Sequence, residues 1–117
     1  MAYAYEMIVC VVNAGFSDAV MSAARACGAR GGTVMGARGT ANKEAETFFK
    51  ISIQPEKEVV LILVPKKLTN DIMHAIYREV GLATPGQGIA FTLPVEQAVG
   101  LPPIETKDTK DAHEKNA

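Results

Sequence analysis

Two glycine-containing segments of the chain carry the residue types that bind phosphate groups. The first, residues 84–88 (Thr-Pro-Gly-Gln-Gly), follows a helical pattern that already ends at Gly81, so Gly86 and Gly88 exceed what a helix end needs. Glycine permits positive φ and close approach of the backbone, which lets several N–H groups converge on one anion. A wide turn that needs its glycines only for geometry is the alternative interpretation. No Lys-Ser or Lys-Thr follows, so the segment is not a Walker motif.

The second segment, residues 31–44, presents an arginine among small residues. Gly39 and Thr40 follow Arg38 directly, so a guanidinium, a flexible backbone and a hydroxyl occur together. This combination suits phosphate oxygens. A loop arginine exposed to solvent is the alternative interpretation.

Residues with catalytic or metal-binding chemistry form no recognisable set. His74 lies within a helical pattern and His113 near the end of the chain, and neither has a Cys or carboxylate partner at a useful spacing. We interpret His74 as a helix-surface or interface residue. The paired acids are interpreted as solvated loop charges or charges that protect a strand edge; they are Glu44, Glu46, Glu56 and Glu58.

Composition limits the class of protein. A chain of 117 residues, 48% of them hydrophobic, suits one domain. Its 12 basic and 13 acidic residues are interspersed, so no nucleic-acid partner is expected. No apolar run reaches the length of a membrane span, and Glu6 stands where a signal peptide has basic residues, so we expect a cytoplasmic protein. Cys10 and Cys27 lie among apolar or small residues, which favours buried reduced thiols.

The hydrophobic pattern predicts the elements that must position these residues. Strands are expected over residues 5–13, 33–40, 57–65 and 88–95, and residues 47–53 are either a strand or an ordered arm. One helix is expected between Ser17, as its N-cap, and the stop at Gly28. A second is expected over residues 70–80, capped by Thr69 or Asn70.

This order predicts an α+β fold of the ferredoxin-like split βαβ type (βαββαβ), with both helices on one face of the sheet. Both alternations of the first and third long strands are apolar, so the helix-free face should be covered as well, most simply by other copies of the chain. We expect one domain over residues 1–101, with an arm at about 37–54, and a flexible charged tail over 102–117.

The element order, the arm and the glycine turn before the last strand together resemble the PII family of trimeric signal-transduction proteins. The resemblance covers about residues 5–101 and rests on GGTVMGARGT, KEVVLILVPKKLTNDIMHAI and TPGQGIAFTLPVEQAVGL, taken in order. It implies a homotrimer with an adenine nucleotide (ATP, ADP or AMP) in clefts between subunits, and a Gly-Asp-Gly core replaced by residues 86–88. The nucleotide-binding residues that we expect are Thr33, Arg38, Gly39, Thr40, Gly86, Gln87 and Gly88.

The sequence departs from the family pattern at several positions. Ile89 follows the glycine turn where the family has lysine, and Leu101, Pro102 and Pro103 replace its arginines. The arm from about Gly36 to Pro55 has no tyrosine for modification and no glutamine next to the arginine. Uridylylation and 2-oxoglutarate sensing are therefore not supported, and the chain is similar to a divergent PII-like member with a shortened loop.

We therefore expect a non-enzymatic signalling protein that regulates a target, such as a membrane transporter or a metabolic enzyme, with nucleotide as effector and no obligatory cofactor. The arm over Ala41–Phe49 should be poorly ordered without ligand, unless two phenylalanines pin it to a neighbour. A trimeric CutA-like metal-tolerance or adaptor protein without a nucleotide ligand is the alternative. A slow nucleotide hydrolase that uses Glu44 or Glu46 is a third hypothesis.

Overall fold

The computed structural model describes residues 4–40 and 55–101. Its elements, in chain order, are β1 (Tyr5–Asn13), α1 (Ser17–Ala26), β2 (Thr33–Arg38), β3 (Glu56–Pro65), the 3-10 helix η1 (Lys66–Leu68), α3 (Thr69–Val80) and β4 (Gly88–Val95). This order confirms the predicted ferredoxin-like βαββαβ fold. The expected strand or arm at 47–53, most of the arm at 37–54 and the tail at 102–117 lie outside the described residues.

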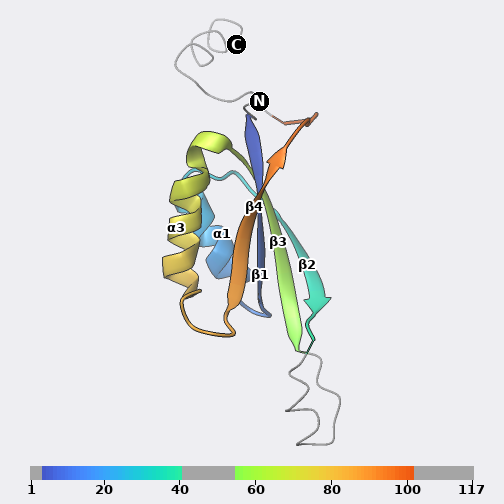
Figure 1. The fold of residues 1–117 in the computed structure, drawn as a ribbon, viewed down its shortest axis with the longest axis vertical. Helices are drawn as coiled ribbons and strands as arrows, with labels where there is room; N and C mark the ends of the chain where they lie inside the picture. Colours follow the sequence, from blue (N-terminus) through green and yellow to red (C-terminus); the bar gives the residue numbers. More distant parts are fainter. Residues whose placement is uncertain (1–3, 41–54, 102–117) are drawn as a thin grey trace, which may run out of the picture.

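The four strands form one antiparallel sheet in the order β2-β3-β1-β4. Figure 1 shows α1 and α3 side by side on one face of this sheet, and neither labelled helix lies on the other face. The inner strands are β1 and β3, the two segments whose apolar residues occupy both alternations. The predicted arrangement of helices and central strands is therefore confirmed.

The hydrophobic core lies between the two helices and the sheet face that they cover. Its fully buried large side chains come from both inner strands and both helices: Ile8, Cys10, Val12, Val20, Val60, Ile62, Val64, Ile72 and Ile76. Burial raises the pKa of the Cys10 thiol to about 11, because the thiolate would lose its solvation. Cys10 is thus a free, protonated core residue, as predicted, and Cys27 is free and half-buried.

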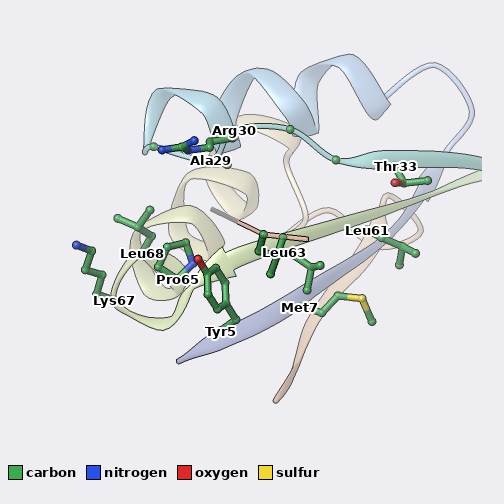
Figure 2. A pocket seen from close by; sticks show the side chains of 14 residues that line it. Tyr5, Met7, Ala29, Arg30, Thr33, Leu61, Leu63, Pro65, Lys67 and Leu68 are labelled. Atoms are coloured by element: carbon green, nitrogen blue, oxygen red, sulfur yellow. The ribbon is translucent and has the colours of Figure 1, made fainter. Parts of the chain in front are cut away.

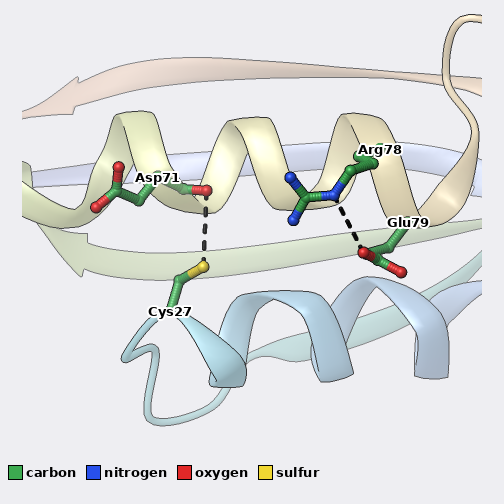
Figure 3. A network of polar contacts seen from close by, with 4 residues as sticks. All are labelled: Cys27, Asp71, Arg78 and Glu79. Carbon is green, nitrogen blue, oxygen red and sulfur yellow. Dashed lines mark hydrogen bonds and ion pairs between the residues drawn. The ribbon is translucent and has the colours of Figure 1, made fainter.

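Few polar contacts join the two helices, as Figure 3 illustrates. The Cys27 thiol, just after α1, donates a weak hydrogen bond of 3.7 Å to the backbone carbonyl of Asp71 in α3. The ion pair between Arg78 and Glu79 (N···O 3.2 Å) lies within α3, and both side chains are mostly exposed, so it does not join the helices. The helices are held together by the buried apolar residues that α1 and α3 share in the core, such as Val20, Ala24, Ile72 and Ile76.

The helix-free side of the sheet, called here the open sheet face, is apolar, and no helix or strand within residues 4–40 and 55–101 covers it. Residues that pair across the strands share a face, so Leu61, Val9 and Phe91 lie side by side on it. Large side chains on this face keep 40–60% of their surface exposed; they are Met35, Leu63, Ile89, Phe91 and Leu93. The predicted apolar helix-free face is confirmed.

The start of α1 differs from the prediction. Ser17 is the first helical residue rather than the N-cap, and Phe16 at the cap position makes no side-chain hydrogen bond. The carboxylate of Glu58 in β3 caps the helix instead: it accepts bonds from Gly15 N–H (2.7 Å), Ser17 N–H (3.4 Å) and Ser17 Oγ–H (3.1 Å). The interpretation of Glu58 as a solvated edge charge was therefore wrong. A negative charge is favourable there because the helix N-terminus presents unpaired N–H groups.

The start of α3 also lacks a side-chain cap. The predicted caps Thr69 and Asn70 are both inside the helix, whose N-cap is Leu68. The 3-10 turn of η1 runs directly into α3, and Lys66 C=O accepts the N–H of Thr69. A preceding 3-10 turn supplies carbonyl groups to the first helical N–H groups, so a side-chain cap is not needed.

Candidate functional site

The glycine turn, residues 84–88, lies between α3 and β4 at the lower end of the sheet in Figure 1. Gly81 ends α3 in the left-handed conformation (φ 78°), as predicted. The turn then closes through a bond of 3.2 Å from Gln87 N–H to Thr84 C=O. Gly86 has a φ of 81° and open space where a side chain would begin. This residue is glycine because of its backbone conformation and not because of crowding.

Gly88 also has a positive φ, of 151°, and in addition lets β4 approach β1. A Cβ atom at this position would lie 2.5 Å from the carbonyl oxygen of Val11 and 3.1 Å from Cα of Val12. Both contacts are with backbone, which cannot move aside without shifting β1. The two glycines beyond the helix end thus have structural reasons of their own, whatever the turn binds.

The side chain of Gln87 turns back toward the helix. Its Nε2 donates a hydrogen bond of 3.2 Å to Val80 C=O, the last residue of α3, and the side chain is half-buried. Its own N–H is used within the turn. Gln87 therefore fastens the turn to α3, a role that its place between two glycines did not reveal.

Two residues that the sequence did not single out stand beside the glycine turn. Asn13 ends β1, and its Nδ2 donates a hydrogen bond of 3.2 Å to Gly86 C=O. Lys57 in β3 pairs with Asn13 across the strands and donates from Nζ to Asn13 Oδ1 at 2.5 Å. The Lys57 ammonium group is thus linked to the turn through two hydrogen bonds, its own to Asn13 and that of Asn13 to Gly86. No local pattern could indicate this, because Asn13 and Gly86 are 73 residues apart.

Arg38, Gly39 and Thr40 lie where β2 leaves the sheet, at the same end as the glycine turn. Arg38 lines a cavity of about 400 Å³ together with Ala14, Gly36, Ala37, Glu56, Lys57 and Glu58. Because β3 and β1 stand between β2 and β4, three strand spacings, about 14 Å, separate Arg38 from the turn. Within one chain, the structure does not bring these two predicted parts together.

Thr33 lies elsewhere, in a larger cavity of about 640 Å³ shown in Figure 2. This cavity exists because β2 begins at Thr33, opposite Leu61, while β3 continues to Pro65. Residues 62–65 therefore have no β2 partner, and the connection from Gly28 to Gly32 encloses the space. The remaining lining residues are Tyr5, Met7, Leu61, Leu63, Pro65, Lys67, Leu68 and Leu101.

The chemistry of this cavity is mostly apolar with a few polar groups. Met7, Leu61 and Leu63 line it from the open sheet face, and the hydroxyl of Thr33 lies at one end. Arg30 and Lys67 lie toward the other end in Figure 2. An apolar wall beside the unpaired edge of a strand suits a flat heteroaromatic group, whose faces are apolar and whose rim makes hydrogen bonds.

Other kinds of site find no support in the described ranges 4–40 and 55–101. These residues contain no cluster of three or more His, Cys, Asp or Glu side chains that could hold a metal ion. In the same ranges, none of the helices has the length and apolar character of a membrane span. His74 is exposed on α3, in agreement with its interpretation as a surface residue.

A known protein family and a solved structure match this chain. The family model for nitrogen regulatory protein P-II matches residues 5–103. The chain belongs to the P-II family. Among solved structures, Arabidopsis thaliana PII bound to citrate is similar in fold, with a TM-score of 0.63, 23% sequence identity, and coverage of 80% of this chain and 77% of that one. A search of curated proteins gave no match.

Membership of the P-II family gives the coarse function. P-II proteins are signalling regulators and not enzymes, and they typically bind adenine nucleotides as effectors. The prediction of a PII-like regulator is therefore confirmed.

Proposed function

We propose that this P-II protein binds an adenine nucleotide between copies of itself and regulates a target protein, such as a membrane transporter or a metabolic enzyme, through the arm that joins β2 to β3. The cavity beside Thr33 would receive the base. The glycine turn, with Lys57 nearby, would receive the phosphate groups. No obligatory cofactor is required, because the nucleotide acts as an effector.

The observation that carries this proposal is that the Thr33 cavity and the glycine turn lie at opposite edges of the sheet, with the apolar open sheet face between those edges. Thr33, Leu61, Val9 and Phe91 follow one another across the four strands, so the cavity and the turn lie toward opposite edges of the sheet. The surface between them is the uncovered apolar face. If that face is buried by assembly, the cavity of one copy meets a neighbour, and a complete site needs two copies.

A homotrimer is the assembly that we propose, because the family implies it and the open sheet face provides the surface to be buried. Arg38, Gly39 and Thr40 would then act from the junction where the arm begins. A guanidinium there suits terminal phosphate oxygens. Arg38→Ala should therefore weaken ATP more than AMP.

Isothermal titration calorimetry with ATP, ADP, AMP and cyclic dinucleotides tests the proposal. Wild-type protein should bind at least one adenine nucleotide below millimolar concentration. Thr33→Val keeps the shape of the side chain and removes the hydroxyl, so we expect a loss of roughly two- to ten-fold in affinity, the value of one neutral hydrogen bond. Ser22→Ala, an exposed hydroxyl removed from α1, is the matched control and should bind like the wild type.

The result that would overturn the proposal is the absence of binding by every nucleotide at millimolar concentration. Equal affinities for wild type, Thr33→Val and Gly86→Ala would instead exclude both the cavity and the turn as parts of the site.

A further inference from the structure

The peptide that joins Gly86 to Gln87 is held from both sides. Its carbonyl accepts the hydrogen bond of Asn13 Nδ2 at 3.2 Å, and its N–H donates to Thr84 C=O at 3.2 Å. The C=O and N–H of a trans peptide point in opposite directions in one plane, so these two bonds fix the orientation of that plane. Gly86, at positive φ with open space around it, would otherwise tolerate several orientations.

The side chain of Asn13 is in turn held by Lys57. An amide has one acceptor end and one donor end, and the Lys57 ammonium can only donate. Because Lys57 occupies Oδ1 at 2.5 Å, the NH₂ end must face Gly86 C=O. Loss of the Lys57 contact would remove the reason for this orientation of the amide.

Lys57 also touches the place where β2 and β3 leave the sheet. Gly39 N–H donates to Pro55 C=O at 2.8 Å and closes this β2–β3 junction. A Cβ at Gly39 would lie 3.2 Å from Cε and 3.4 Å from Cγ of Lys57, so the lysine stem packs on the glycine. Contacts therefore run without a break from the junction, through Lys57 and Asn13, to the glycine turn.

We propose that Asn13 is a positioning residue that couples the β2–β3 junction to the glycine turn. The junction positions Lys57, Lys57 orients the Asn13 amide, and that amide fixes the Gly86–Gln87 peptide. A change at either end alters the hydrogen bond available at the other. The coupling itself is a property of the ligand-free chain, whereas its use in nucleotide binding rests on the proposed function.

A glycine-labelled sample allows the coupling to be measured without ligand. Selective ¹⁵N labelling of the ten glycines gives a sparse NMR spectrum in which Gly86 and Gly88 can be assigned from single Gly→Ala variants. Lys57→Met removes the donor to Asn13 and should shift the Gly86 and Gly88 signals. Lys66→Met, an equal loss of charge on an exposed lysine at the other end of β3, should leave them in place.

The double variant decides whether the effect passes through Asn13. In an Asn13→Ala background, Lys57→Met should no longer shift the two glycine signals, because the link is already broken. Asn13→Asp has a similar shape and keeps the acceptor for Lys57, but it cannot donate a hydrogen bond to Gly86 C=O. It should therefore also break the link to the turn. This variant replaces Asn13→Ala if Asn13→Ala folds poorly. Unchanged signals in Lys57→Met, or an equal shift in the Asn13→Ala background, would overturn the proposal.

Titration with ATP separates this inference from the proposed function. If ATP binds at the turn, Asn13→Asp should weaken it by roughly two- to ten-fold, and Lys57→Met should add less in that background than in the wild type. Fully additive losses would contradict the coupling in the bound state. If ATP does not bind, the proposed function fails, while the ligand-free spectra still confirm or overturn the role of Asn13.

Discussion

Glu58 caps the N-terminus of α1 in place of a side chain from the helix's own sequence. Its carboxylate accepts bonds from Gly15 and Ser17, the residues that open α1, although it belongs to β3. The hydrogen bond from Gly15 N–H is the main cause of a lowered pKa; partial desolvation opposes it, and the bonds from Ser17 add to it. The charged form is thus favoured in the folded chain.

Glu58→Gln should therefore lower the free energy of unfolding at neutral pH. A lowered folded-state pKa means that the unfolded chain binds more protons, so the carboxylate contribution is fully present above the ordinary glutamate pKa. It is lost as pH falls through the lowered folded pKa. Urea unfolding at several pH values should show the wild type and Glu58→Gln converging in acid, whereas Glu96→Gln, an exposed control, should match the wild type throughout. A pH-independent difference would contradict this account.

At the scale of elements, the glycine turn determines how closely β4 approaches β1. Gly88→Ala places a methyl group against the Val11 carbonyl, and overpacking of this kind costs about 1–3 kcal/mol. Gly86→Ala meets no atom and carries only the cost of the left-handed conformation, about 1–2 kcal/mol. Gly86→Asn should be the mildest, because asparagine tolerates that conformation.

Thermal unfolding of the three variants should rank Gly88→Ala below Gly86→Ala, and Gly86→Asn nearest to the wild type. An Asn variant as unstable as Gly88→Ala would show that the positive φ of Gly86 is not what the turn requires.

The hydrophobic pattern of the sequence predicted the strands and helices, because each of these elements depends mainly on residues close together in the chain. Strands at 5–13 and 88–95 were predicted to the residue, since apolar runs mark them, with Gly15 just after the first and Gly88 at the start of the second. The cap of α1 was missed because Glu58 lies 41 residues away from Ser17. The cavity beside Thr33 was missed for a similar reason: it arises from the register of β2 on β3, which no single segment encodes.

At the scale of the whole molecule, the open sheet face should control assembly. Phe91 is 41% exposed on this face in a single chain, so Phe91→Glu leaves the folded chain intact but places a charge in any interface formed there. Light scattering should give three times the chain mass of 12.5 kDa for the wild type and a smaller species for Phe91→Glu. Tyr77→Glu, at 56% exposure on α3, is the matched control and should assemble normally.

A wild-type protein that remains at the mass of one chain at all concentrations would contradict the proposed trimer. If Phe91→Glu assembles like the wild type, the contact between copies lies on a surface other than the open sheet face.

The separation of the Thr33 cavity from the glycine turn has a consequence for how the protein responds to its own abundance. If each complete site needs two copies, nucleotide binding and assembly promote each other by mass action. Dilution would weaken nucleotide binding without any change in nucleotide concentration, and nucleotide would hold together copies that otherwise separate. The amount of protein in the cell would then set the threshold at which it responds, as a second input beside its ligand.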